Sequence, residues 1–322
     1  MRIWFIGGGE FAASCLFCLS AESAHLRFEK IVTGEPTKAG RGLGERVSAV
    51  ERAACELGLA FERTGPLSRN EKLKNAMIAD PPDLVFVVDF AQIIKEPFLN
   101  GPQHGCLNIH PSLLPRWRGA APVQRAILNG DAVAGVTVFR LVKELDSGPI
   151  LAQKEVPIPI DVDSTELFKN LALTGSQIAI QSVQSIIEGN CQFSEQNSEF
   201  ATYAVKLTKE EARISWERSC ISVHNTVKAF ASSFGAFVTI GGKRLKVWRT
   251  ELTNTIPVDV EGAPGTILSL AEGDPVIGCA DGALRLVEVQ SEGKRRVSGA
   301  EWLRGAGLKG IRLEEGGVLT PE

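Results

Sequence analysis

The sequence predicts an α/β domain with an open, Rossmann-like sheet, followed by a smaller β-barrel domain of the OB type. The first half alternates apolar strand patterns with helix patterns, which is typical of a parallel sheet. A polar stretch, GNCQFSEQNSEF, interrupts this alternation at 189–200. Short strands separated by Gly, Asp-Gly and Glu-Gly turns follow it and favour a small barrel. We therefore expect a catalytic domain at 1–189, a linker at 190–205 and a second domain at 206–322.

The individual elements follow from hydrophobic periodicity and turn residues. DLVFVVDF at 83–90, for example, is a continuous apolar run typical of a strand covered on both faces. In the first domain we expect strands at 2–6, 28–33, 60–61, 83–90, 106–110, 135–142 and 149–158, with helices at 10–20, 46–58, 68–79, 120–128 and 163–187. In the second domain we expect a helix at 219–231 and strands at 235–240, 244–252, 265–270, 275–280 and 283–290.

The composition excludes several classes of protein. The chain has 322 residues, 44% hydrophobic and 23% charged, which is ordinary for a globular enzyme with two cores. Its net charge of -3 means that a polyanionic partner has to be met by a local basic patch. No run approaches the roughly 20 apolar residues of a membrane span, and MRIWFIGGG is too short for a signal peptide. We expect a cytoplasmic, monomeric protein with no membrane partner.

The seven cysteines are scattered and odd in number, which favours a reducing compartment over a disulfide framework. Cys15 and Cys18 form a CxxC pair, but they lie among apolar residues of an expected helix, so core packing is favoured over redox chemistry. No second CxxC or nearby His pair completes a zinc ligand set. We therefore predict that the protein has no metal site.

The turn Gly7-Gly8-Gly9 follows the first strand and invites comparison with dinucleotide-binding turns. Ala12 is a permitted variant of the third glycine, but no acidic residue ends the second strand at Thr33. The pattern favours a structural turn, or a small-anion site at a helix N-terminus, over NAD binding.

The candidate active site lies in CLNIHPSLLPRWRGAAP, residues 106–122. Alternate side chains of a strand face the same way, so Asn108 and His110 project together at a carboxyl end, where open α/β sheets place functional groups. A carboxamide can donate to a developing oxyanion while an imidazole handles a proton. The following loop, stiffened by Pro111 and Pro115, offers backbone groups beside apolar side chains, a surface suited to a flat heteroaromatic ligand.

The residues alone leave alternatives open. His110 by itself also fits a partly buried histidine with a satisfied hydrogen bond. Asp146, at the turn in LDSGPI, fits a turn-forming residue as well as a catalytic one. No serine or cysteine nucleophile is marked by a G-x-S-x-G elbow. The constellation therefore favours a reaction in which the substrate supplies the nucleophile.

These residues resemble those of the folate-dependent formyltransferases, and especially the methionyl-tRNA formyltransferase family. The wider group shares N-x-H-x-SLLP and the later Asp, whereas RWRGAAP at 116–122 is similar to the tRNA enzymes. AGRG, TYAVKLTKEEARISW and the C-terminal segments resemble the same family, so the match extends over nearly the whole chain. The resemblance implies formyl transfer from 10-formyltetrahydrofolate to the amino group of methionyl-initiator tRNA, in support of translation initiation.

The resemblance also implies a role for individual residues. Asn108, His110 and Asp146 correspond to the catalytic set. The residues that correspond to the folate site are Ser112, Leu113, Leu114, Pro115 and Phe90, and those that correspond to the tRNA-binding loop are Lys38, Arg41, Gly42 and Arg46. The chain departs from the family pattern where Gly8-Gly9 replaces Thr-Pro and Asp89-Phe90-Ala91 replaces Ala-Tyr-Gly.

Two other functions stay open at this point. One is a folate-dependent formyltransferase that acts on another amine, such as a nucleotide-linked amino sugar. The other is a non-catalytic RNA- or folate-binding relative, which the divergent segment 89–95 suggests and the intact Asn108, His110 and Asp146 count against. In the second domain, KRLKVWR and GKRRVSGAEWLR fit a basic nucleic-acid stripe with interleaved Trp248 and Trp302, or outward charges over inward-packed tryptophans.

Overall fold

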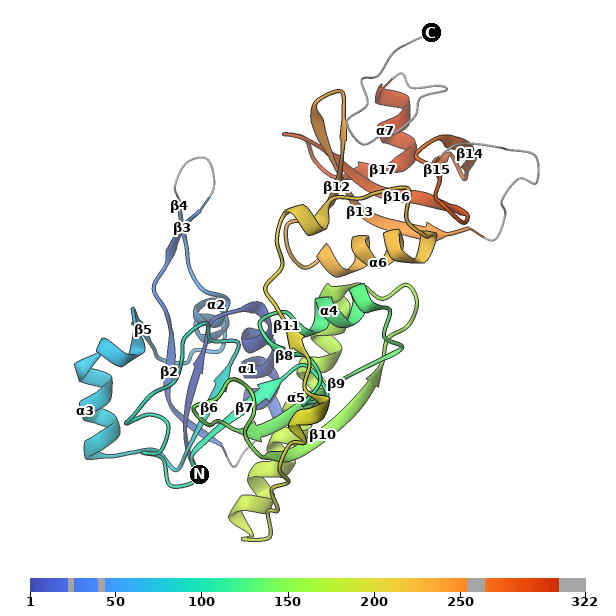
Figure 1. Ribbon diagram of the computed structural model, residues 1–322. Helices are drawn as coiled ribbons and strands as arrows, with labels where there is room; N and C mark the ends of the chain where they lie inside the picture. The colour runs from blue at the N-terminus through green and yellow to red at the C-terminus, as the bar shows by residue number, and fades with distance from the viewer. Residues whose placement is uncertain (23–25, 40–43, 254–263, 307–322) are drawn as a thin grey trace. The chain divides into compact units, whose positions relative to one another are not determined.

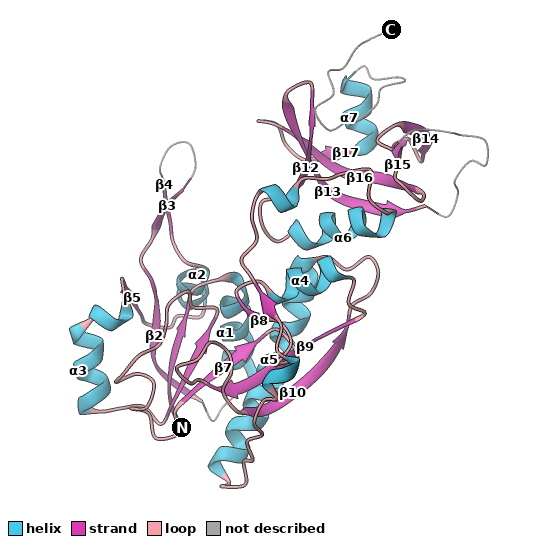
Figure 2. Ribbon diagram, viewed as in Figure 1, coloured by secondary structure: helices cyan, strands magenta, loops and turns pink. Residues whose placement is uncertain are grey.

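A computed structural model of the chain describes residues 1–22, 26–39, 44–253 and 264–306 (Figures 1 and 2). The chain divides into two compact units. The first comprises Met1–Pro122, Val133–Pro157 and Phe168–Ala204, and the second comprises Val123–Ala132, Ile158–Leu167 and Val205–Glu322. Each unit therefore draws on separate stretches of the chain, and the predicted boundaries at 189 and 206 stay predictions.

The first unit is built on a seven-stranded sheet with the strand order β10-β9-β7-β6-β1-β2-β5. The strands are β1 (Arg2–Gly7), β2 (Arg27–Gly34), β5 (Phe61–Thr64), β6 (Leu84–Val88), β7 (Cys106–His110), β9 (Val133–Arg140) and β10 (Ile150–Pro157). Strands β1, β2, β5, β6 and β7 pair in parallel, whereas β9 runs antiparallel to both β7 and β10. The predicted open α/β sheet is confirmed, with an antiparallel edge added to it.

Helices cover both faces of this sheet (Figure 2). They are α1 (Glu10–Glu22), α2 (Ala49–Glu56), α3 (Glu71–Ala79) and α5 (Ser164–Ile187). Phe11 of α1 packs against Phe168 of α5 with ring centroids 5.9 Å apart. A Cβ at Gly175 of α5 would lie 2.7 Å from Cγ2 of Ile109, so α5 packs closely under β7. Leu73 of α3 belongs to the apolar cluster of the opposite face.

The helix starts differ from the sequence expectation for local reasons. The helix expected from residue 46 begins at Ala49, because β4 (Gly44–Arg46) pairs with β3 (Thr37–Ala39) and the Ser48 hydroxyl accepts from the Glu51 amide. The helix expected from 68 begins at Glu71, where Asn70 caps the amide of Leu73, and a 3-10 turn (Leu67–Arg69) precedes it. In both cases the cap defines the start.

Two short segments far apart in sequence also pair. Strand β8 (Arg118–Gly119) lies parallel to β11 (Tyr203–Ala204) in the first unit. The sequence patterns did not predict this pair, because two-residue strands carry no periodicity. The pairing joins the stretch after the NIH motif to the segment that follows α5 and a 3-10 turn (Ser198–Phe200).

The second unit carries a curled antiparallel sheet of the OB-like type. Its strands, in the order β12-β13-β16-β15-β14 with β17 paired to β16, are β12 (Ala236–Ile240), β13 (Lys243–Leu252), β14 (Ile267–Ala271), β15 (Asp274–Gly278), β16 (Ala283–Ser291) and β17 (Val297–Ser298). Its helices are α4 (Pro122–Asn129, from Val123 on), α6 (Cys220–Phe230) and α7 (Gly299–Ala306), preceded by a 3-10 turn (Glu210–Ala212). Helix α7 was not predicted from the strand-and-turn pattern.

Candidate active site

Strand β7 brings Asn108 and His110 to the carboxyl end of the parallel strands. It lies between β6 and β9, with Asn108 opposite Val87 of β6 and His110 opposite Thr137 of β9. His110 is buried, whereas Asn108 keeps some exposed surface. Within the described part of the chain, the Asn108 carboxamide forms no side-chain hydrogen bond. Its donor is thus available to a substrate.

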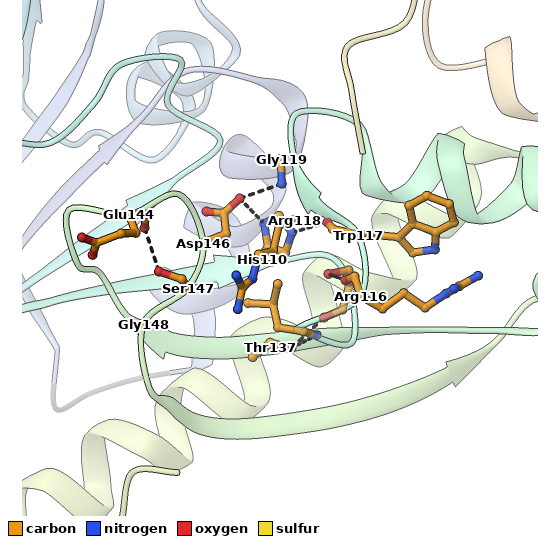
Figure 3. A network of polar contacts seen from close by, with 12 residues as sticks. His110, Arg116, Trp117, Arg118, Gly119, Thr137, Glu144, Asp146, Ser147 and Gly148 are labelled. Atoms are coloured by element: carbon orange, nitrogen blue, oxygen red, sulfur yellow. Dashed lines mark hydrogen bonds and ion pairs between the residues drawn. The ribbon is translucent and has the colours of Figure 1, made fainter. Parts of the chain in front are cut away.

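Each ring nitrogen of His110 has a polar neighbour (Figure 3). Its Nε2 lies 3.0 Å from the carbonyl oxygen of Trp117. A carbonyl only accepts, so Nε2 carries the proton and donates it. In the neutral ring the lone pair therefore sits on Nδ1. That nitrogen lies 4.0 Å from Oδ2 of Asp146, close enough for a protonated ring to be stabilised by the carboxylate.

Asp146 is a buried carboxylate with one fixed oxygen. Its Oδ2 accepts a hydrogen bond of 2.8 Å from the backbone amide of Gly119, as Figure 3 shows. The same oxygen faces Nδ1 of His110. The structure thus brings His110 and Asp146 together, which the spacing of 36 residues in the sequence does not show.

Left-handed backbone occurs in the loops that follow three strands of this sheet. The described residues include four non-glycine residues with positive φ, and three of them, Asp89, Trp117 and Asp146, follow β6, β7 and β9. Trp117 has φ 61°, an unusual value for a bulky residue. Its amide donates to the Thr202 hydroxyl while its carbonyl accepts from His110. Strain of this kind clusters at functional sites, where the surrounding structure holds it in place.

The loop 112–115 is rigid because its polar groups are used internally. The hydroxyl of Thr137 donates to the carbonyl of Ser112 and accepts from the amide of Leu114. Gln153 donates to the Leu114 carbonyl and to the same Thr137 hydroxyl. The carbonyl groups of Leu113 and Pro115 also accept backbone hydrogen bonds. The loop therefore offers a ligand a fixed shape. The sequence had led us to expect free backbone polar groups there, but most of them are already used within the protein.

Glycine at position 135 of β9 accommodates this loop. A Cβ there would overlap the side chain of Leu113. Leu114 is buried, and its bond to Pro115 is cis. Phe90 follows β6 and packs, partly exposed, against the apolar cluster beneath the sheet. The residues assigned to folate thus come from the loops after β7 and β6.

The two departures from the family pattern meet in space. A Cβ at Gly9 would overlap the carboxylate of Asp89, and the Gly9 amide donates to the Asp89 carbonyl. Asp89 keeps exposed surface, but the turn crowds its carboxylate. This desolvation, together with the charge of Glu10, raises the pKa of Asp89, and the amide of Phe11 opposes the shift. A carboxylate of the protein thus lies at the N-terminus of α1, which disfavours a dinucleotide phosphate there.

We expect Gly9→Ala to destabilise the protein by about 1–3 kcal/mol, because the new methyl group meets the Asp89 carboxylate. The same substitution made together with Asp89→Ala should cost less than half as much, since the obstructing group is gone. Urea unfolding of the four proteins of this double-mutant cycle measures the coupling. Equal costs of Gly9→Ala in both backgrounds would refute the spatial pairing.

Two of the residues assigned to tRNA, Lys38 and Arg46, lie in the strand pair β3–β4 of the first unit. Arg46 ends β4 and is exposed, opposite Thr37 of β3. Lys38 lies in β3, paired with Glu45, but the position of its side chain is not described. Arg41 and Gly42 lie outside the described residues. The structure does not bring Arg46 into contact with His110 or Asp146.

The second unit holds a compact group of basic side chains, here called the basic cluster: Arg244, Lys246 and Arg296. The guanidinium of Arg296 stacks 3.5 Å from the centroid of the Trp248 ring, and Lys246 lies 5.2 Å from it. Burial, with the charges of Arg296 and Arg244, lowers the pKa of Lys246. Trp248 is buried beneath these charges, and Trp302 is buried as well.

Sequence reasoning missed the residues that hold the loops. Thr137 and Gln153 fix loop 112–115, and Gln196, held by Arg118, contacts the Asp146 loop. Thr137 sits opposite His110 in the register, which a correct pairing of β7 with β9 would have revealed. Nothing local to Gln196 signals its contact with a residue 50 positions away.

The fold and site define an α/β enzyme of the acyl-transfer class. A family model described as "Formyl transferase" matches residues 1–183, and one described as "Formyl transferase, C-terminal domain" matches residues 206–307. The chain belongs to the formyl transferase family.

Relatives match along nearly the full length. The methionyl-tRNA formyltransferase of Methylococcus capsulatus is 37% identical over 313 residues, which is 97% of this chain and 99% of the relative. That of Paracoccus denitrificans is 37% identical over 308 residues, covering 96% and 98%.

Solved structures share the fold at lower identity. HypX from Aquifex aeolicus in complex with tetrahydrofolic acid has a TM-score of 0.66 at 20% identity, covering 98% of this chain and 48% of HypX, so the chain spans about half of that protein. An N-formyltransferase from Helicobacter canadensis, with folinic acid and dTDP-3-aminofucose, has a TM-score of 0.63 at 18% identity, covering 90% and 99%.

Proposed function

We propose that this protein transfers the formyl group of 10-formyltetrahydrofolate to the free amino group of methionyl-initiator tRNA, and so supports translation initiation. The observation that carries the choice of acceptor is the similarity to methionyl-tRNA formyltransferases, which extends through the C-terminal domain at 37% identity over 97% of the chain. The arrangement of Asn108, His110 and Asp146 supports the chemistry.

The reaction forms one C–N bond and breaks another. The amine of the aminoacyl group attacks the formyl carbon, and a tetrahedral intermediate with a negative oxygen forms. Asn108, whose side-chain amide has no hydrogen-bond partner among the described residues, donates to that oxygen. The Nδ1 atom of His110 takes the proton that the attacking amine loses. The C–N10 bond then breaks, and His110 gives the proton from Nδ1 to N10, so that tetrahydrofolate leaves neutral and the imidazole is restored.

Asp146 acts through His110 in this scheme. Protonation of Nδ1 creates an imidazolium, because Nε2 keeps the proton that it donates to Trp117. The carboxylate at 4.0 Å stabilises that charge. Gly119 fixes the carboxylate oxygen, so little rearrangement is needed as the proton arrives.

Folate as the formyl donor is supported by the family and by the rigid loop. Ser112 to Pro115 and Phe90 lie in the loops beside His110 and offer apolar side chains to a pterin ring. Tetrahydrofolic acid in HypX and folinic acid in the Helicobacter canadensis enzyme accompany the same fold. In the described residues no group of His, Cys, Asp and Glu is arranged to hold a metal ion, and the proposed chemistry uses none.

Binding of the tRNA backbone would fall to the basic cluster, with Lys38, Arg41, Gly42 and Arg46 as the loop that contacts the acceptor end. Grouped cations neutralise phosphates and release counterions, so affinity falls as salt rises. None of the helices in the described ranges is long and apolar enough to cross a membrane. A cytoplasmic location and a monomeric state stay predictions.

The test is incubation of the purified protein with 10-formyltetrahydrofolate and charged initiator tRNA, scored for formyl-methionine. We expect formylation that depends on both substrates and persists after treatment with a metal chelator. An amino-sugar nucleotide, offered in parallel as acceptor, should stay unmodified. Formylation of the sugar without formylation of the tRNA would overturn the proposed acceptor.

A further inference from the structure

Gln196 lies in the stretch expected to be a linker, yet its side chain is built into the candidate active site. Its Oε1 accepts from Nε and Nη2 of Arg118, at 3.1 and 2.7 Å. Its Nε2 donates to the backbone carbonyl groups of Asp146, at 2.9 Å, and Gly148, at 2.7 Å. A primary amide has two N–H donors and one carbonyl acceptor, so every polar group of Gln196 is used.

The topology explains why the Asp146 loop needs such a contact. Arg140 at the end of β9 lies opposite Leu107, near the start of β7, and the Leu141 amide donates to the Cys106 carbonyl. His110 lies four residues beyond Cys106 along β7, a distance of about 13 Å in an extended strand. The loop that leaves β9 therefore has to return along β7 for the Asp146 carboxylate to reach the imidazole.

The carboxylate of Asp146 reaches the imidazole from a backbone in the left-handed region, with φ 48°. Its carboxylate is held by the Gly119 amide, and its own carbonyl by Gln196. Gly119 follows Arg118, the residue that anchors Gln196. The two hydrogen bonds that fix Asp146, one from Gly119 directly and one from Gln196, which Arg118 anchors, therefore both depend on strand β8.

The surrounding segment keeps Gln196 in place. Ser194 pairs with Ile150 at the start of β10 through two backbone hydrogen bonds of 2.8 and 2.9 Å. The guanidinium of Arg140 stacks 4.1 Å from the centroid of the Phe193 ring. The Arg118 side chain is buried, so its charge is held where Gln196 can accept from it.

We propose that Gln196 is a positioning residue of the formyl-transfer reaction, which fixes the backbone of Asp146 so that its carboxylate faces Nδ1 of His110. This rests on the function proposed above. The Nε2 donor of Gln196 positions the Asp146 loop, and its Oε1 acceptor anchors the side chain on Arg118. Gln196 itself touches neither His110 nor the reacting atoms.

Two substitutions separate the halves of the amide. Gln196→Glu keeps an acceptor for Arg118 but cannot donate to the carbonyl groups of Asp146 and Gly148. Gln196→Met keeps the length of the side chain and removes both halves. We expect each to lower kcat by roughly 10- to 100-fold, the effect of a displacement of about 1 Å at the reacting centre, and to leave both KM values within about threefold. Gln184→Glu, on the exposed face of α5, adds the same charge and is expected to behave as wild type.

A double-mutant cycle with Asp146→Asn shows whether Gln196 acts through Asp146. If it does, adding Gln196→Met to Asp146→Asn lowers kcat by less than about threefold further, because residues that work as a unit are not additive. Independent, multiplying losses would overturn the assignment, and so would a wild-type kcat for Gln196→Glu.

Hydrogen exchange of residues 142–148 tests the same inference without activity. We expect faster exchange in both Gln196 variants and none of this change in Gln184→Glu. Unchanged exchange overturns the positioning role, even if the wild-type protein proves unable to formylate Met-tRNA. Absence of activity in the wild type, with faster exchange in the variants, overturns only the proposed function.

Discussion

Replacement of His110 by alanine is expected to lower turnover by about 10²- to 10⁴-fold, the range that a positioned general base contributes. The reason lies in the two contacts of the ring. Trp117 holds Nε2, so Nδ1 is the nitrogen that takes the proton from the attacking amine. Alanine has no group that can accept this proton, so water has to take it instead. Steady-state rates of formyl-methionine formation measure the loss.

A matched control is His104→Ala, at the turn before β7 and at the other end of the strand from the site. This variant should retain wild-type turnover, whereas binding of charged tRNA should survive in both variants because the imidazole contributes to chemistry. A His110→Ala protein with near-normal turnover and a wild-type melting temperature would remove His110 from the proposed role.

Much of the fold could be predicted because its signals are local. The run at 84–88 is apolar at every position, and strand β6 is buried at every position as expected. The antiparallel direction of β9 against β7 is not encoded in either strand, since the same apolar pattern serves both directions. Helix α7 follows β17 directly, and the local signal for its start is the cap of the Glu301 amide by the Ser298 hydroxyl, which the strand-and-turn pattern did not include.

The site could be predicted where its geometry is local. Asn108 and His110 are two residues apart on one strand, and strand periodicity alone places them on the same face. The Asp146 contact depends on how a whole loop returns along β7, and the contact of Gln196 depends on the path of the chain after α5. Both are tertiary contacts, for which single-sequence patterns carry no signal. The resemblance supplied Asp146, but not Gln196.

Asn108→Ala should lower kcat by about 10²- to 10³-fold, the cost of losing one donor to a developing oxyanion. KM for each substrate should change little, because the hydrogen bond strengthens only as the negative charge forms. The half-buried position and the absence of a side-chain hydrogen bond among the described residues make this carboxamide free to act. Asn100→Ala, an exposed asparagine before β7, serves as the matched control.

Asn108→Asp distinguishes electrostatic stabilisation from mere filling of space. An ionised carboxylate has nearly the same shape as the amide but only accepts hydrogen bonds, so it repels the oxyanion instead of binding it. We therefore expect Asn108→Asp to lose more activity than Asn108→Ala at neutral pH. If the aspartate variant were the more active of the two, the amide would serve packing, and the oxyanion would be stabilised by another donor. Because Asn108 and His110 serve one transition state, the double alanine variant should fall well short of the product of the two single losses.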